Sequence, residues 1–137
     1  MVERVFVYGS LRRGAPGGMA RLLRPGSQPL GGARLRGRLL HLGAYPGLLP
    51  GGSGWVRGEL HRLTDPLAVL QRLDRYEGCA SAQPAAEFRR VELEVLGPAG
   101  QRLTAWVYLY TGCVGGRSSV PSGDWLSACR TAVGPRH

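Results

Sequence analysis

Residues 4–11 read Arg-Val-Phe-Val-Tyr-Gly-Ser-Leu, a β-branched and aromatic run that stops abruptly at a glycine. Such a run is typical of a buried strand, and Gly9-Ser10 predicts a tight loop directly after it. A glycine there lets the loop turn back and direct several backbone N–H groups to one point, which suits a carboxylate or an oxyanion. A plain turn would have the same sequence, so two interpretations of the loop stay open.

Strands dominate the rest of the chain. Four further segments have the composition of strands, namely residues 33–42, 55–63, 87–96 and 103–110. The last two flank Gly-Pro-Ala-Gly at 97–100, which predicts a hairpin. The Pro/Gly-rich residues 46–54 predict an exposed connection.

The segment 103–110 is apolar on both of its faces. Leu103, Ala105, Val107 and Leu109 point one way, and Thr104, Trp106, Tyr108 and Tyr110 point the other. A strand of this kind belongs in a sheet covered on both sides or in one closed into a barrel. The aromatic face then either lines a cavity or packs in the core.

One helix is clearly marked at residues 67–76, with Asp65 as its cap, Pro66 in its first turn and Gly78 at its exit. Shorter helices are predicted at 19–23 and 124–133. The 137 residues fit one domain, 1–137, with 43% hydrophobic residues for its core.

An acidic residue stands on the apolar face of the marked helix. Glu77 follows Leu70 and Leu73 at helical spacing, so its carboxyl is expected to point inward. Burial and the negative end of the helix dipole both raise a carboxyl pKa, and a general acid or base at neutral pH needs such a pKa. The alternative is a surface ion pair between Glu77 and an arginine such as Arg72, Arg75 or Arg89.

The net charge of +9 comes from 18 arginines and no lysine, set against 9 acidic residues. Together with the abundance of glycine, alanine and proline, this composition is typical of a GC-rich genome. The arginines are single or in the two pairs Arg12-Arg13 and Arg89-Arg90, without interleaved aromatics. The sequence therefore predicts no specific nucleic-acid partner.

Membrane, disulfide and metal sites all lack sequence signals. The apolar runs are too short to cross a bilayer and the start is polar, so we expect a soluble, cytoplasmic protein without a membrane partner. The sequence has an odd number of cysteines and no Cys-x-x-Cys pair, the three being Cys79, Cys113 and Cys129. The three histidines are far apart in the sequence, and no metal or other cofactor is predicted. Phosphate-loop, dinucleotide and serine-hydrolase motifs are also missing from the sequence.

Taken in order, five short motifs resemble the γ-glutamylcyclotransferase-like family. They are Val-Phe-Val-Tyr-Gly-Ser-Leu-Arg-Arg-Gly at 5–14, Leu-Gly-Ala-Tyr-Pro-Gly-Leu-Leu-Pro at 42–50, Val-Arg-Gly-Glu-Leu at 56–60, Leu-Asp-Arg-Tyr-Glu-Gly at 73–78 and Val-Tyr-Leu-Tyr at 107–110. The resemblance continues to Ser-Gly-Asp-Trp at 122–125. It implies an α+β fold, a small mixed β-barrel with a few peripheral helices.

The resemblance also implies an enzyme whose small-molecule substrate is a γ-glutamyl amine or peptide. Glu77 takes the place of the essential glutamate, and the loop Tyr8, Gly9, Ser10 and Leu11 holds the substrate. The cavity tyrosine of the family corresponds to Tyr108 or Tyr110. The implied products are 5-oxoproline and a free amine. The alternative function is a non-catalytic barrel of the same fold that binds a small carboxylate.

Overall fold

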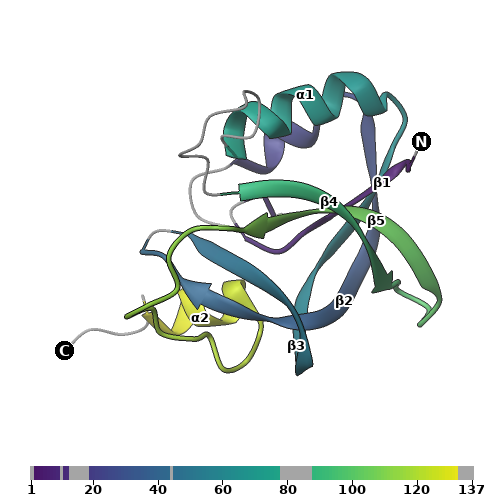
Figure 1. Cartoon of the computed structure of the whole chain (residues 1–137). Coiled ribbons are helices and arrows are strands. Elements are labelled where there is room, and N and C mark those ends of the chain that lie inside the picture. The colour runs from purple at the N-terminus through teal and green to yellow at the C-terminus, as the bar shows by residue number, and fades with distance from the viewer. Residues whose placement is uncertain (1, 10, 13–18, 44, 78–87, 133–137) are drawn as a thin grey trace.

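A closed five-stranded barrel forms the centre of the protein in the computed structural model (Figure 1). The structure describes residues 2–9, 11–12, 19–43, 45–77 and 88–132. In chain order the elements are β1 (Arg4–Val7), the 3-10 helix η1 (Met19–Leu23), β2 (Ser27–His41), β3 (Pro46–Leu63), α1 (Pro66–Glu77), β4 (Phe88–Leu96), β5 (Arg102–Tyr110) and α2 (Trp125–Ala132). Around the barrel the order is β1-β3-β2-β4-β5. Among the described strands, only the β1–β5 pairing is parallel, so the predicted mixed barrel is confirmed.

Strand β1 separates two hydrophobic clusters because its side chains alternate in direction. Phe6 lies in the cluster that fills the barrel, and Trp125 of α2 packs in the same cluster. Val5 and Val7 lie in the second cluster, between the barrel and α1. Figure 1 shows α1 and η1 together on one side of the barrel and α2 on the other. The predicted helices are therefore present, and each closes one apolar surface of the sheet.

Strand β5 contributes to both clusters, as its two apolar faces predict. Ala105 and Val107 are fully buried inside the barrel. Tyr108 and Tyr110 belong to the cluster beneath α1, with Trp106 packed at its margin. The aromatic face of this strand is thus covered by a helix rather than by solvent.

The prediction of an exposed connection at residues 46–54 is wrong for residues 46–49 and holds only for the exposed residues 51–54. Strand β3 begins at Pro46, and Pro46 to Leu49 pair with the end of β2. Only residues 51–54 leave the ladder, where the register changes from Arg36↔Trp55 to Gly37↔Pro50. A proline is tolerated at the first residue of a strand, and two glycines with φ of 88° and 84° allow the bulge. The composition of residues 46–54 is therefore typical of a loop, although most of the segment is paired in a strand.

Among the described residues, no helix combines the length and the apolar character needed to cross a membrane.

Gly58 is a position where the barrel leaves no room for a side chain. A Cβ there would overlap the carbonyl oxygen of Val7 and lie 2.6 Å from Cζ of Phe6. We expect Gly58→Ala to lower the free energy of unfolding by about 2 kcal/mol or more, because the backbone of β1 must move. The control is Gly32→Ala on the paired strand, where the nearest atom is 4.0 Å away. Urea unfolding of both variants tests this, and equal midpoints would contradict it.

Candidate functional site

The loop after β1 is anchored at both of its ends. Tyr8 is 6% exposed, and its hydroxyl donates a hydrogen bond of 2.6 Å to the carbonyl of Tyr108. The N–H of Arg12 donates to the carbonyl of Gly9 at 3.0 Å and closes a turn. A Cβ on Gly9 would lie 2.8 Å from the ring of Pro46, so the close approach of β3 requires glycine there. Ser10 lies outside the described residues.

Helix α1 packs its apolar face onto the barrel. Leu70 and Leu73 are buried, and Leu11 from the loop belongs to the same cluster. Glu77 is the last residue of α1, but its side chain is not among those described, so its inward direction remains a prediction. Arg72, one of its expected surface partners, instead donates to the backbone carbonyls of Leu22 and Pro25.

Asp74, one turn before Glu77, joins α1 to the barrel. Its Oδ1 accepts hydrogen bonds from the Tyr108 hydroxyl at 2.6 Å and from Nε of Arg90 at 2.8 Å. Its Oδ2 accepts a second bond from Arg90, through Nη2 at 3.2 Å. Arg90 and Tyr108 are direct partners across β4 and β5. Both strands therefore hold the last turns of the helix through one carboxylate.

Arg90 is itself held by the aromatic face of β5. Its guanidinium carbon lies 4.3 Å from the ring centroid of Trp106, a cation–π contact. The indole N–H of Trp106 donates to the carbonyl of Val2 at 3.0 Å, next to the start of β1. The guanidinium of Arg90 is thus held between the ring of Trp106 and the carboxylate of Asp74.

The two tyrosines named from the sequence lie on the same face and have different partners. Tyr108 is 2% exposed and its hydroxyl is bound to Asp74. The hydroxyl of Tyr110 donates to the carbonyl of Cys113 at 2.9 Å. The ring of Tyr110 also packs edge-on against Phe88, with centroids 5.7 Å apart. Both rings share a cluster with Leu11, so the structure brings three of the predicted positions together.

A family model described as γ-glutamyl cyclotransferase, AIG2-like, matches residues 5–127. The chain belongs to this family. In Escherichia coli K12, a protein named γ-glutamylcyclotransferase family protein YtfP is 36% identical over 130 residues, which cover 90% of this chain and 96% of the relative. A γ-glutamylaminecyclotransferase of the rat is 31% identical over 121 residues, or 78% of this chain and 77% of the relative.

The barrel is also that of solved structures in this family. The crystal structure of an AIG2-like protein from the mouse superimposes with a TM-score of 0.67 at 27% identity and covers 82% of this chain and 80% of its own. The predicted family and fold are therefore both confirmed.

Sequence reasoning missed the contact between Asp74 and Arg90, which holds α1 on the barrel of this γ-glutamylcyclotransferase-like protein. Asp74 follows Leu70 by four residues and so shares the inward face of the predicted helix, but no local pattern marks it as a partner of Arg90 or Tyr108. Arg90 stood out only as half of an arginine pair. Arg90 lies two residues after Phe88, so both side chains are on the face of β4 toward α1. The sequence alone does not reveal the partner of Arg90, because that partner depends on the strand register.

A second set of charges fixes the segment just after the loop. Arg12 donates from Nη1 to Oδ1 of Asp124 at 2.8 Å, and its Nε lies 3.7 Å from Oε2 of Glu59. Burial raises the pKa of Asp124, but the hydrogen bond and charge of Arg12 and the backbone N–H groups of Ser127 and Leu126 outweigh it. The pKa of Asp124 therefore lies below its ordinary 3.8.

Within the described residues, no group of three or more histidine, cysteine or acidic side chains is placed to hold a metal ion. Cys113 is an exposed free thiol. Cys79 lies outside the described residues.

The Asp74–Tyr108 hydrogen bond can be tested by a double-mutant cycle of Asp74→Ala and Tyr108→Phe. We expect each variant to lose stability and the pair to show a coupling of about 1 kcal/mol, because the bond is charge-assisted and mostly buried. The matched control is Glu94 with Arg102, an exposed pair 3.9 Å apart, for which we expect no measurable coupling. Additive losses for Asp74 and Tyr108 would contradict the bond.

The Arg12–Asp124 pair predicts a defined dependence of stability on pH. Because the folded pKa of Asp124 is depressed, its contribution is complete above the unfolded pKa near 3.8 and is lost as pH falls through the folded value. We expect Asp124→Asn, which can still cap α2, to be less stable than the parent at pH 6 and to approach it below about pH 4. Urea unfolding across this range measures the gap. A gap that stays constant to the lowest pH would exclude the ion pair as its cause.

Proposed function

We propose that the protein is a γ-glutamylcyclotransferase that converts a γ-glutamyl amine or peptide into 5-oxoproline and a free amine. The observation that carries the proposal is the packing of Leu11 in one buried cluster with Leu73 and Tyr108. This packing brings the loop after β1 close to the last turns of α1, where Glu77 stands. Membership of the family and similarity to the γ-glutamylaminecyclotransferase of the rat support the same reaction class.

The proposed reaction is an intramolecular acyl transfer. The α-nitrogen of the substrate attacks the carbon of its own γ-carbonyl, a five-membered ring closes, and the bond from that carbon to the departing nitrogen breaks. The α-nitrogen begins as an ammonium and ends as a lactam N–H, so it loses two protons. The departing nitrogen begins as an amide N–H and ends as an ammonium, so it gains two. The reaction balances without an oxidant, a reductant or a co-reactant.

In this proposal Glu77 moves those protons. Its carboxylate takes a proton from the ammonium, which cannot attack while protonated, and returns it to the departing nitrogen. A position at the C-terminal end of α1 favours a raised carboxyl pKa, because the negative end of the helix dipole opposes ionisation. A carboxyl of raised pKa exchanges protons readily near neutral pH.

The loop and the tyrosines take separate roles. Backbone N–H groups in the loop from Gly9 to Leu11 hold the glutamyl end of the substrate and stabilise negative charge on the attacked carbonyl. The hydroxyls of Tyr108 and Tyr110 are bound to Asp74 and to the carbonyl of Cys113. We therefore propose that the rings of both tyrosines support the site by packing, and that Tyr108 also positions α1 through its bond to Asp74. Holding the substrate in a bent conformer brings the two reacting atoms together.

The decisive experiment incubates the purified protein with a panel of γ-glutamyl amines and dipeptides and measures 5-oxoproline by mass spectrometry. We expect turnover of at least one compound, and a loss of about 100-fold or more in kcat for Glu77→Gln, which removes the base. Glu94→Gln, in the exposed pair with Arg102, is the matched control and should keep the parent rate.

Two outcomes would overturn this function. Full activity of Glu77→Gln would show that another group moves the protons. Binding of a γ-glutamyl compound, seen as a raised melting temperature, with no product from any compound would favour the non-catalytic carboxylate-binding barrel instead.

A further inference from the structure

The outer face of β2 and β3 carries a row of arginines that the folded chain brings together. Arg34, Arg36 and Arg38 occupy alternate positions of β2 and are all exposed, because the residues between them face the barrel interior. Arg57 on β3 is the direct cross-strand partner of Arg34. Arginines that are separate in the sequence therefore form one basic surface.

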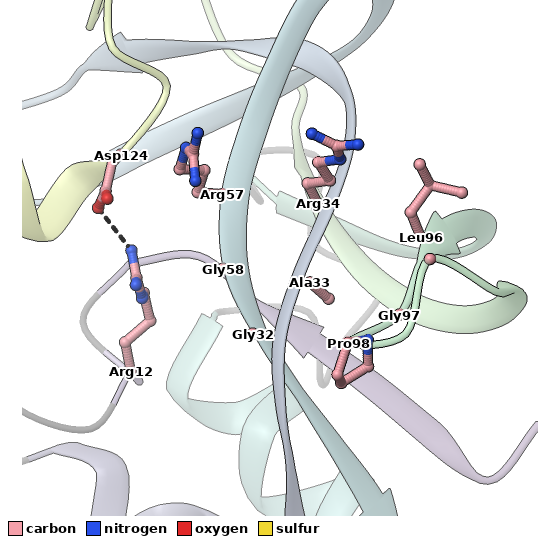
Figure 2. Close-up of a pocket in the computed structure, with 11 residues that line it drawn as sticks. Arg12, Gly32, Ala33, Arg34, Arg57, Gly58, Leu96, Gly97, Pro98 and Asp124 are labelled. Atoms are coloured by element: carbon pink, nitrogen blue, oxygen red, sulfur yellow. Dashed lines mark hydrogen bonds and ion pairs between the residues drawn. The ribbon is translucent and has the colours of Figure 1, made fainter.

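A cavity of about 350 Å³ opens on this surface (Figure 2). Arg34 and Arg57 rise from the two strands, Arg12 and Asp124 form one wall, and the β4–β5 turn at 96–100 forms the other. The hollow exists partly because Gly32, two residues before Arg34 on the same face of β2, has no side chain. A Cβ there would have no neighbour nearer than 4.0 Å.

The lining of the cavity has an excess of positive charge. The cavity is lined by three arginines, Arg12, Arg34 and Arg57, and by one acidic residue, Asp124, whose carboxylate is already bound by Arg12 at 2.8 Å. Within the part of the chain that the structure describes, no ion pair joins Arg34 or Arg57 to an acidic side chain. Two cations thus remain beside the cavity without a counter-charge.

One of these cations is held in place by an aromatic ring. The guanidinium carbon of Arg34 lies 4.6 Å from the ring centroid of Trp55, and that of Arg36 lies 3.8 Å from the same centroid. Such cation–π contacts limit the motion of an exposed arginine, so less freedom is lost when a ligand binds it.

We propose that this cavity is a binding site for the phosphate group of a small molecule. A phosphate carries about two negative charges at neutral pH, which matches the two unbalanced guanidiniums, and its oxygens suit the paired N–H donors of arginine. The volume lies in the range of small-molecule sites. The cavity shares no lining residue with the cluster of Leu11, Leu73 and Tyr108, so this proposal does not depend on the cyclotransferase reaction.

A nucleic acid fits the same surface less well. Base stacking needs an accessible aromatic face, whereas the guanidiniums of Arg34 and Arg36 both lie against Trp55. The side chain of Arg36 also donates to the carbonyl of Ser53 at 2.7 Å, which holds it at the bulge of β3. The observations therefore favour a single phosphate in the cavity over a polyanion along the strand.

The test titrates the protein with inorganic phosphate and with glycerol phosphate, each at an ionic strength kept constant with chloride. Binding is followed by calorimetry and by two-dimensional NMR of the backbone amides. We expect saturable binding to one site, with shifts confined to residues around the cavity. Arg34→Gln and Arg57→Gln should each weaken binding about tenfold, because each removes a charge-assisted pair. Tighter binding of glycerol phosphate would identify a phosphorylated metabolite as the ligand, and equal binding would identify the free anion.

Arg38→Gln is the matched control, since Arg38 is exposed on the same face of the same strand but does not line the cavity. We expect its affinity for phosphate to stay within twofold of the parent. The proposal is overturned if phosphate binding does not saturate. It is also overturned if the three variants weaken binding equally, because that result indicates a diffuse surface charge and not a site. It is also overturned if affinity rises steadily with oligonucleotide length, which indicates a polyanion surface.

Discussion

The arrangement of the site depends on the hydrogen bonds that the carboxylate of Asp74 accepts from Arg90 and Tyr108. The apolar stripe of α1 holds the helix against the barrel, but hydrophobic contact has no direction and allows the helix to rotate or slide. Three hydrogen bonds to Arg90 and Tyr108, two of them to the same oxygen, fix one orientation. The turn that follows Asp74 is thereby fixed relative to β4 and β5, and Glu77 stands at its end.

The alternation of β1 sets where the loop lies in relation to that helix. Phe6 belongs to the barrel cluster, whereas Val5 and Val7 belong to the cluster under α1, so a shift of one residue would exchange their positions. The parallel pairing of Val5 with Trp106 brings the end of β1 to the same region as the end of β5. The hydroxyl of Tyr8 then bonds the backbone of Tyr108, so the loop and the strand that binds Asp74 are directly connected.

Local patterns in the sequence predicted most of the elements but not their long-range contacts. The two-sided apolar character of residues 103–110 correctly indicated a strand covered on both faces, and Pro66 correctly marked the start of the helix. The connection at 46–54 was mispredicted, because proline and glycine are typical of loops, whereas pairing with β2 keeps Pro46 to Leu49 in a strand. The bond between Asp74 and Arg90 joins residues 16 positions apart and depends on strand register, which no local pattern fixes.

The arginines show why composition and position must be weighed separately. The presence of 18 arginines and no lysine is typical of a GC-rich genome, but composition does not determine where the side chains lie. Arg12, Arg72 and Arg90 are bound to carboxylates or carbonyls and hold the loop, η1 and α1 in place. Arg34 and Arg57 have no such partner in the described chain, yet they lie side by side at a hollow. Like charges placed together repel each other, and no acidic side chain in the described chain offsets this repulsion between Arg34 and Arg57. Their proximity costs free energy, and a bound phosphate group would offset this repulsion by attracting both guanidiniums.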